Sequence, residues 1–246
     1  MRLLVPLGEY LVFVSRVFRK PPRRKIFGKN LLVELQSLGI NSIGIVVIIS
    51  LFTGAVVALQ VAYNTDNPLI PKYLVGYSTR QSMILEFSPT IIALILAGKV
   101  GSNIASQIGT MRVTEQIDAL EVMGVNTANY LVLPKVIASV LVNPILVIFS
   151  IFVGIFGGWL AMTTTHKVSS HDFLTGIYLD YYNFDIIYAL IKTVVFAFLI
   201  TTISGFYGYY TEGGALEVGK SSTKAVVTAS TMIIIANLII TQILLI

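Results

Sequence analysis

Charged residues are scarce in this chain, and cysteine is absent altogether. Only 12% of its 246 residues are charged, whereas 55% are hydrophobic. A soluble domain carries about 25% charged residues, so this chain has too little polar surface to solvate a globule of its size, and lipid must cover the rest. The lack of cysteine excludes disulfides and thiolate metal sites. Because the only two histidines are His166 and His171, we expect no metal and no cofactor.

The N-terminal segment, residues 1–25, lacks the features of a signal peptide, because Glu9 interrupts its apolar run and no small-x-small cleavage site follows. Its apolar residues recur at helical spacing, namely Leu3, Leu7, Tyr10, Leu11, Val14 and Phe18. Its charged residues fall on the other side, namely Arg2, Glu9, Arg16 and Lys20. This pattern predicts an amphipathic helix in the membrane interface. A helix packed on the bundle is the alternative, since periodicity does not separate the two.

Long uncharged runs predict helices that cross the membrane. Such a helix needs about 20 apolar residues, and its backbone must satisfy its own hydrogen bonds in hydrocarbon. Four runs qualify, over residues 35–65, 136–166, 193–211 and 225–246. A fifth stretch contains Glu86, Lys99 and Pro89, which is expected to kink it or mark its start; it fits one span or two shorter helices. We predict one domain, residues 1–246, with spans over residues 38–63, 82–106, 136–163, 188–210 and 225–246.

Basic residues predict the orientation of these spans, because Lys and Arg accumulate on the cytoplasmic side. The segment ahead of the first span carries most of them: Arg2, Arg16, Arg19, Lys20, Arg23, Arg24, Lys25 and Lys29. Each later loop carries fewer. We therefore expect a cytoplasmic N-terminus and, with five spans, a C-terminus on the opposite face.

The polar stretch after the second span, GTMRVTEQIDALEVMGVN, has a helical pattern. Its charged residues follow i, i+3 spacing, namely Arg112, Glu115, Asp118 and Glu121. Apolar residues can line one side, namely Met111, Ile117, Leu120 and Met123, and Gly124 is well placed as a C-terminal cap. We predict a helix over residues 110–123 on the cytoplasmic side, which either docks a soluble partner or is a solvated loop helix.

Two intramembrane charges are candidate functional groups, because ionisable residues in spans are usually functional. Glu86 and Lys99 are 13 residues apart, or about 20 Å along one helix, so they cannot pair within it. We expect each either to meet a lipid headgroup or a neighbouring subunit, or to snorkel to an interface.

The segment GALEVGKS, residues 214–221, fits the phosphate-binding pattern GxxxxGK[ST]. That pattern requires a preceding strand and a surrounding parallel sheet. Too little chain follows to supply a further strand, because the last span needs it. We therefore predict a flexible cytoplasmic loop here, and likewise a hydrophilic loop rather than a metal site over residues 163–185. Small residues at Gly154 and Gly158, and at Ser50 and Gly54, would permit close helix packing.

Three segments carry a resemblance to a known family. IGTMRVTEQIDALEVMGVN resembles the signature of the MlaE permease family of bacterial ABC transporters. LEFSPTIIALILAGKVGSNIASQIG and GGALEVGKSSTKAVVTAS resemble the flanking family segments, in the expected order over most of residues 54–230. The chain departs from the family pattern at Leu85, Ser88, Lys99, Gln107 and Asn237, which weakens any fixed charge-pair mechanism.

The resemblance implies a five-span, all-α integral membrane subunit with an N-terminal interfacial helix, working as a homodimer in the bacterial inner membrane. It implies two separate ATPase subunits, an MCE-domain substrate-binding protein, and transport of phospholipids between the inner membrane and the outer envelope. It assigns ATPase coupling to the helix that carries Arg112, Glu115, Asp118 and Glu121. It assigns lipid contacts to positions matching Val57, Gln60 and Glu86.

These implications describe a non-catalytic subunit whose partner hydrolyses ATP, and no nucleic-acid partner is expected. The alternative function is a secondary transporter of a small amphiphilic solute, which predicts internal repeats and broken helices; no convincing repeat is found. An intramembrane enzyme would need a nucleophile or metal motif, and neither GxSxG nor HExxH occurs. A purely structural anchor would not require Glu86 and Gln107 within the membrane.

Overall fold

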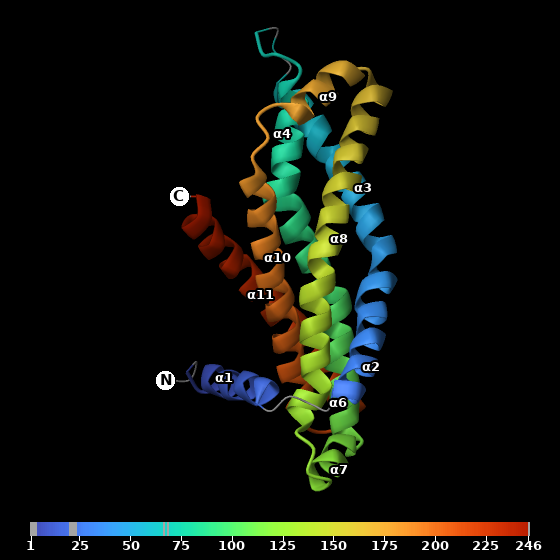
Figure 1. Ribbon diagram of the computed structural model, residues 1–246, viewed down its shortest axis with the longest axis vertical. Coiled ribbons are helices and arrows are strands. Elements are labelled where there is room, and N and C mark those ends of the chain that lie inside the picture. The colour runs from blue at the N-terminus through green and yellow to red at the C-terminus, as the bar shows by residue number, and fades with distance from the viewer. Residues whose placement is uncertain (1–3, 20–23, 66, 68, 246) are drawn as a thin grey trace. The chain divides into compact units, whose positions relative to one another are not determined.

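The computed structural model describes residues 4–19, 24–65, 67 and 69–245. All regular structure in these ranges is helical (Figure 1), which confirms the predicted all-α class. Five helical runs are long and apolar enough to cross a membrane: Phe27–Asn64, Leu74–Val113, Thr127–Thr165, Asn183–Tyr209 and Ala215–Leu245. The chain is therefore a multi-pass membrane protein. Parts of two predicted helices lie outside the described residues, namely residues 1–3 (with Arg2 and Leu3), residues 20–23 (with Lys20) and Ile246.

The first two spans are built from several consecutive helical segments. The first comprises α2 (Arg24–Leu35) from Phe27 onward, the π-helical η1 (Gln36–Ile40) and α3 (Asn41–Asn64). The second comprises α4 (Leu74–Ser82), π-helical η2 (Met83–Ile91), α5 (Ile92–Leu96), π-helical η3 (Ala97–Gly101) and α6 (Ser102–Val113). Pro89 lies inside η2, where a widened turn can accommodate the lost backbone donor. The second span is thus one continuous run rather than two shorter helices.

The remaining elements are α7 (Gln116–Val122), α8 (Thr127–Thr165), α9 (Ser170–Tyr178), α10 (Asn183–Tyr209) and α11 (Ala215–Leu245). The prediction of a flexible loop over residues 214–221 is wrong, because α11 begins at Ala215. The Ser221 hydroxyl donates to the Tyr207 carbonyl at 2.6 Å and accepts from Thr211 at 2.9 Å. These bonds tie the first turns of α11 to the end of α10, so the phosphate-binding pattern lies on a packed helix.

Contacts divide the chain into two compact units. Unit 1 consists of the described parts of Met1–Asn41, Ala93–Val142 and Val194–Ile246. Unit 2 consists of the described parts of Ser42–Ile92 and Asn143–Thr193. Each unit draws on separate stretches of sequence, and α8 and α10 contribute residues to both.

In unit 2, α3 and α8 approach closely through small residues. A Cβ added at Gly54 would lie 1.8 Å from the carbonyl oxygen of Gly154, so the two backbones are in contact. Ser50 donates to the Ser150 hydroxyl at 2.8 Å one turn away. The small residues noted in the sequence therefore form a helix–helix contact of the kind that glycine permits in membranes.

The other end of unit 2 contains α9, which occupies part of the predicted hydrophilic loop. The Ser169 hydroxyl caps this helix by accepting from the Asp172 amide at 3.0 Å. Phe173 is fully buried and packs with Ala58, Val75 and Met162. The prediction of a plain loop over residues 163–185 is therefore wrong for this stretch, because an apolar face of α9 packs into the core.

In unit 1, α1 (Leu4–Phe18) lies across the end of α10 (Figure 1). Phe13 and Val17 are fully buried, and the Phe13 ring contacts those of Phe206, Tyr209 and Tyr210. Another apolar stripe stays outside: Leu7, Leu11 and Phe18 are each more than half exposed. The helix thus packs against the bundle along one face and leaves a second apolar face uncovered.

Candidate functional site

The short helix α7 is separated from α6 by a break in the backbone. Glu115 adopts the left-handed conformation at φ 59°, which ends the α-helical hydrogen-bond pattern. Residues 110–113 therefore complete α6, and α7 begins at Gln116 rather than at Thr110. Gly124 at φ 76° ends α7, and the Val125 amide donates back to the Leu120 carbonyl at 3.1 Å in the arrangement typical of a glycine-capped C-terminus.

The four charged residues predicted for this helix have three different environments. Asp118 pairs with Arg112 at 2.6 Å on the exposed surface, where such a pair contributes little to stability. Glu121 points back toward the spans and accepts from the Tyr209 hydroxyl at 2.6 Å and the Thr127 hydroxyl at 2.9 Å. The carboxylate of Glu115 makes no hydrogen bond or ion pair with the residues that the structure describes.

The Glu121 carboxylate is stabilised in its ionised form. The hydrogen bond from Tyr209 is the main cause that lowers the pKa of Glu121, and the Thr127 hydroxyl and the positive charges of Arg112 and Arg16 add to it, against a smaller opposing effect of burial. The Arg112 guanidinium also lies 6.0 Å from the centre of the Tyr209 ring. The site therefore holds a negative charge at neutral pH.

Glu121 joins α7 to two membrane-spanning helices, because Thr127 is the first residue of α8 and Tyr209 the last of α10. Ile117 of α7 is fully buried, whereas Val122 and Met123, at the C-terminal end of α7, are 90% and 68% exposed. The apolar residues expected to line one side of this helix thus differ in exposure, with Ile117 buried and Met123 exposed. A displacement of α7 would act directly on the ends of α8 and α10.

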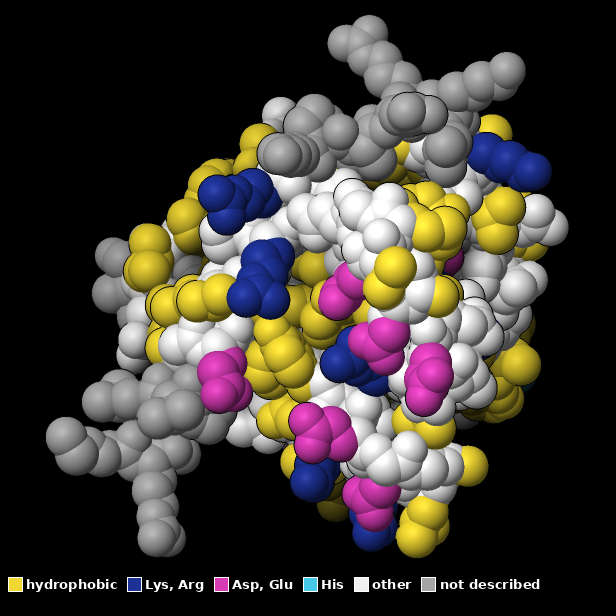
Figure 2. All heavy atoms as spheres, turned by 90° about the horizontal axis from the view of Figure 1, so that it is seen from below, with side chains coloured by type: hydrophobic (Ala, Val, Ile, Leu, Met, Phe, Trp, Pro, Cys, Tyr) yellow, Lys and Arg dark blue, Asp and Glu magenta, His cyan; other side chains and the backbone are white. Residues whose placement is uncertain are grey.

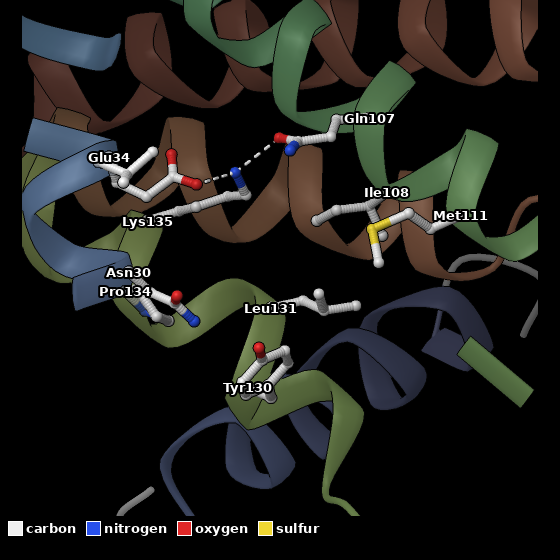
Figure 3. Close-up of a pocket in the computed structure, with 10 residues that line it drawn as sticks. Asn30, Glu34, Gln107, Ile108, Met111, Tyr130, Leu131, Pro134 and Lys135 are labelled. Atoms are coloured by element: carbon white, nitrogen blue, oxygen red, sulfur yellow. Dashed lines mark hydrogen bonds and ion pairs between the residues drawn. The ribbon is translucent and has the colours of Figure 1, made fainter. Parts of the chain in front are cut away.

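A pocket of about 260 Å³, lined by both polar and apolar side chains, adjoins this region in unit 1 (Figure 3). Its charged centre is Lys135 of α8, which is 4% exposed and donates to Glu34 of α2 at 2.5 Å and to Gln107 of α6 at 2.7 Å. The three side chains converge from three different elements (Figure 3). Removing one partner would leave a buried charge unsatisfied, so these helices are held together at this point.

The lipid-contact residues predicted in unit 2 differ in accessibility. Val57 is 6% exposed and belongs to the interior, whereas Gln60 is exposed. The side chain of Glu86 is 46% exposed and accepts from Lys192 at 2.8 Å, while the Lys192 side chain is fully buried. In the part of the chain that the structure describes, no hydrogen bond or ion pair joins Gln60 to Glu86.

The expected partners of the two intramembrane charges need correction. Glu86 pairs with Lys192 of the same chain rather than only with a headgroup or a neighbouring subunit. The Lys192 ammonium also donates to the Leu85 carbonyl at 3.2 Å and lies 4.5 Å from the centre of the Tyr188 ring. Within unit 1, Lys99 donates to the Asn41 carbonyl. The sequence could have indicated Lys192 as a further intramembrane charge, since it is a lysine within the predicted span 188–210.

One protein-family model matches the part of the chain that contains the residues of the candidate site. A family model described as "Permease MlaE" matches residues 31–243. The chain belongs to the MlaE permease family. This MlaE-family match includes α7 and every predicted site residue, and α1 precedes it.

Individual relatives agree with the MlaE assignment. A probable ABC transporter permease protein of Rickettsia bellii is 35% identical over 98% of this chain and 93% of its own length. A probable ABC transporter permease protein of Synechocystis is 36% identical over 91% of this chain and 84% of its own. The intermembrane phospholipid transport system permease protein MlaE of Haemophilus influenzae is 32% identical over 92% of this chain and 86% of its own.

Proposed function

We propose that this MlaE-family protein is the permease subunit of an ABC-type transporter that moves phospholipids between a bacterial inner membrane and the outer envelope. It works as a homodimer with two separate ATPase subunits and an MCE-domain protein. Family membership and the names of the relatives support this proposal. The permease contributes no ATP chemistry; it converts movement of the ATPase into a change around bound lipid.

The observation that carries the coupling proposal is the attachment of Glu121 to Thr127 and Tyr209. A docking helix transmits force only if it is fixed to the elements that must move, and these bonds fix α7 to the ends of α8 and α10. The apolar tip at Val122 and Met123 gives the ATPase an exposed surface to bind. Arg112, Glu115 and Asp118 form the charged rim of this docking surface.

The proposed orientation has the N-terminus, α7 and the α10–α11 connection on the cytoplasmic side. Alternation of five spans requires these three segments to share one side. Acidic and basic side chains gather on the face at the α7 end (Figure 2), as expected for a surface in water. The crosswise position of α1, with Leu7, Leu11 and Phe18 uncovered, suits a helix whose outer face contacts the membrane interface.

We assign the transported lipid to unit 2. Each buried methylene contributes about 0.8 kcal/mol, so a phospholipid leaves its leaflet slowly unless another apolar surface receives its chains. Gln60 and the exposed part of Glu86 provide polar contacts along α3 and η2, and Val57 shapes the α3 surface from within. Lys192 keeps Glu86 oriented.

Co-purification tests the docking surface. Val122→Asp combined with Met123→Asp places charge on the exposed apolar tip, and we expect loss of the co-expressed ATPase from the purified complex. Leu69→Asp is the matched control, because Leu69 is 89% exposed, like Val122 at 90%, but lies in the connection between the first two spans. On their own, Glu115→Lys and Asp118→Lys should also weaken docking. Normal ATPase recovery with the Val122 and Met123 variant would overturn the proposal.

A further inference from the structure

A second pocket of unit 1 lies where α1, the end of α10 and the start of α11 meet. Three aromatic rings form its wall, those of Phe206, Tyr207 and Tyr210, with Phe206 5.5 Å from Tyr207 and 5.1 Å from Tyr210 between ring centres. Charged side chains surround the rings: Glu9, Glu212, Glu217, Lys220 and Lys224. Three carboxylates and two ammonium groups give this pocket a formal charge of −1.

Most of this charge is not neutralised within the chain. Glu217 and Lys220 pair at 2.5 Å on the surface. Glu9, Glu212 and Lys224 form no ion pair with any residue in the described ranges. Among the described residues, the pocket therefore offers two unpaired carboxylates and one unpaired ammonium group beside its aromatic rings. Such a pocket is complementary to a ligand that carries both a positive and a negative charge.

An apolar pocket continues from the same rings. It shares Phe206 and Tyr207 with the charged pocket and is otherwise lined mainly by Leu7, Tyr10, Ile203 and Met232. Along α11, Met232 lies 8 residues beyond Lys224, or about 12 Å deeper into the span at the rise of an α-helix. The polar pocket thus lies at the helix ends and the apolar one farther into the membrane-spanning part.

We propose that this composite pocket binds one phospholipid with a zwitterionic headgroup, of the ethanolamine or choline type. The ammonium group fits against the aromatic rings, which attract cations within about 6 Å of their centres, and beside the carboxylate of Glu212. The phosphate reaches Lys224, and an acyl chain runs past Phe206 toward Met232. This lipid joins α1 to α10 and α11 and is distinct from lipid assigned to Glu86 in unit 2.

Headgroup selection follows from the charge of the pocket. An anionic phosphatidylglycerol can offer its phosphate to Lys224, but it has no cation for the rings and carboxylates. A cation–aromatic contact together with one carboxylate contact corresponds to about tenfold in affinity. We therefore expect ethanolamine and choline lipids to be retained about tenfold better than glycerol lipids.

The test uses the full-length permease in nanodiscs containing equal parts of phosphatidylethanolamine, phosphatidylcholine and phosphatidylglycerol. After extraction into detergent, mass spectrometry of the intact protein identifies the retained lipid. Glu212→Gln should reduce ethanolamine retention about fivefold, and Lys224→Gln should reduce retention of all three lipids. Tyr210→Leu should remove the preference between headgroups. The first two positions are exposed, so these variants should fold normally.

Matched controls make the same chemical changes elsewhere. Asp180→Asn also neutralises one acid, at an exposed left-handed residue that asparagine tolerates, and Lys167→Gln removes one exposed ammonium. Neither should alter retention. Because the permease is assayed without its ATPase, the result is independent of docking and transport.

Three results would overturn the proposal. The first is equal retention of the three lipids by the unmodified protein, and the second is a preference that Glu212→Gln leaves unchanged. The third is a disulfide-linked dimer formed through Lys224→Cys in this cysteine-free chain, since a second copy rather than lipid would then cover the pocket.

Discussion

Lys192 has a fully buried side chain and donates to Glu86 across 2.8 Å, whereas the Glu86 side chain remains 46% exposed. The two partners therefore depend on the pair to different degrees. Lys192 relies on Glu86 for charge compensation, with further support from the Leu85 carbonyl and the Tyr188 ring. Glu86 can also be solvated from outside.

This asymmetry predicts unequal effects of removing each partner. Glu86→Gln leaves a buried ammonium group without an opposing charge and should lower the free energy of unfolding by about 3 kcal/mol. Lys192→Met should be less damaging, because the carboxylate that remains is half exposed. The double variant should be about as stable as Lys192→Met, and thermal unfolding in detergent measures all three. Equal destabilisation by the two single changes would contradict this prediction.

The contact between α3 and α8 predicts a sharp difference between two glycines of α3. Gly54→Ala places a methyl group 1.8 Å from the Gly154 carbonyl oxygen, so the helices must separate, and we expect a loss of about 3 kcal/mol. Gly44→Ala is the matched control, because no atom lies within 4 Å of its added Cβ. Alanine favours helix over glycine by up to about 1 kcal/mol, so this variant should unfold at the same or a higher temperature.

The bond from Tyr209 to Glu121 predicts a dependence on pH. Since the bond lowers the pKa of Glu121 below its ordinary 4.5, its stabilising contribution is fully present above pH 4.5 and is lost as pH falls through the lowered value. Tyr209→Phe removes the donor. The variant should be less stable than the unmodified protein at pH 7, and the difference should shrink as the pH falls below 4.5. A difference that stays constant from pH 7 to pH 3 would contradict the role of the Glu121 charge and would assign the loss to the 2.8 Å bond between the Tyr209 and Thr127 hydroxyls or to packing.

The five spans could be predicted because each depends only on local composition. About 20 apolar residues in succession determine a membrane crossing, and neither Glu86 nor Lys99 prevents the second span from forming. The ends of the helices were harder to predict. The start of α11 carries the polar residues Glu217, Lys220 and Ser221. Ser221 holds it against the end of α10 by bonds to Tyr207 and Thr211, a tertiary contact that hydropathy does not report.

The partners of the charged residues could not be predicted from spacing, because they come from distant parts of the chain. Glu34 meets Lys135, and Glu86 meets Lys192, in each case through the packing of two spans. Of the four charged residues predicted for this helix, only Asp118 and Glu121 lie in α7, and their spacing did not reveal that Glu121 points inward. Its partner Tyr209 lies 88 residues away.

The two faces of α1 predict opposite outcomes for two apolar residues. Phe13 is fully buried among Phe206, Tyr209 and Tyr210, and Phe13→Ala should cost about 3 kcal/mol in unfolding free energy through the cavity left behind. Leu11, at 58% exposed, is the control on the other face, and Leu11→Ala should leave thermal unfolding in detergent unchanged. The exposed face of α1 can be tested in liposomes by labelling. We expect lipid to shield a cysteine introduced at position 11 from a water-soluble maleimide, and we expect this cysteine to react once a short-chain detergent replaces the lipid. Rapid labelling in intact liposomes would mean that this face of α1 lies in water, and that packing against α10 alone holds the helix in place.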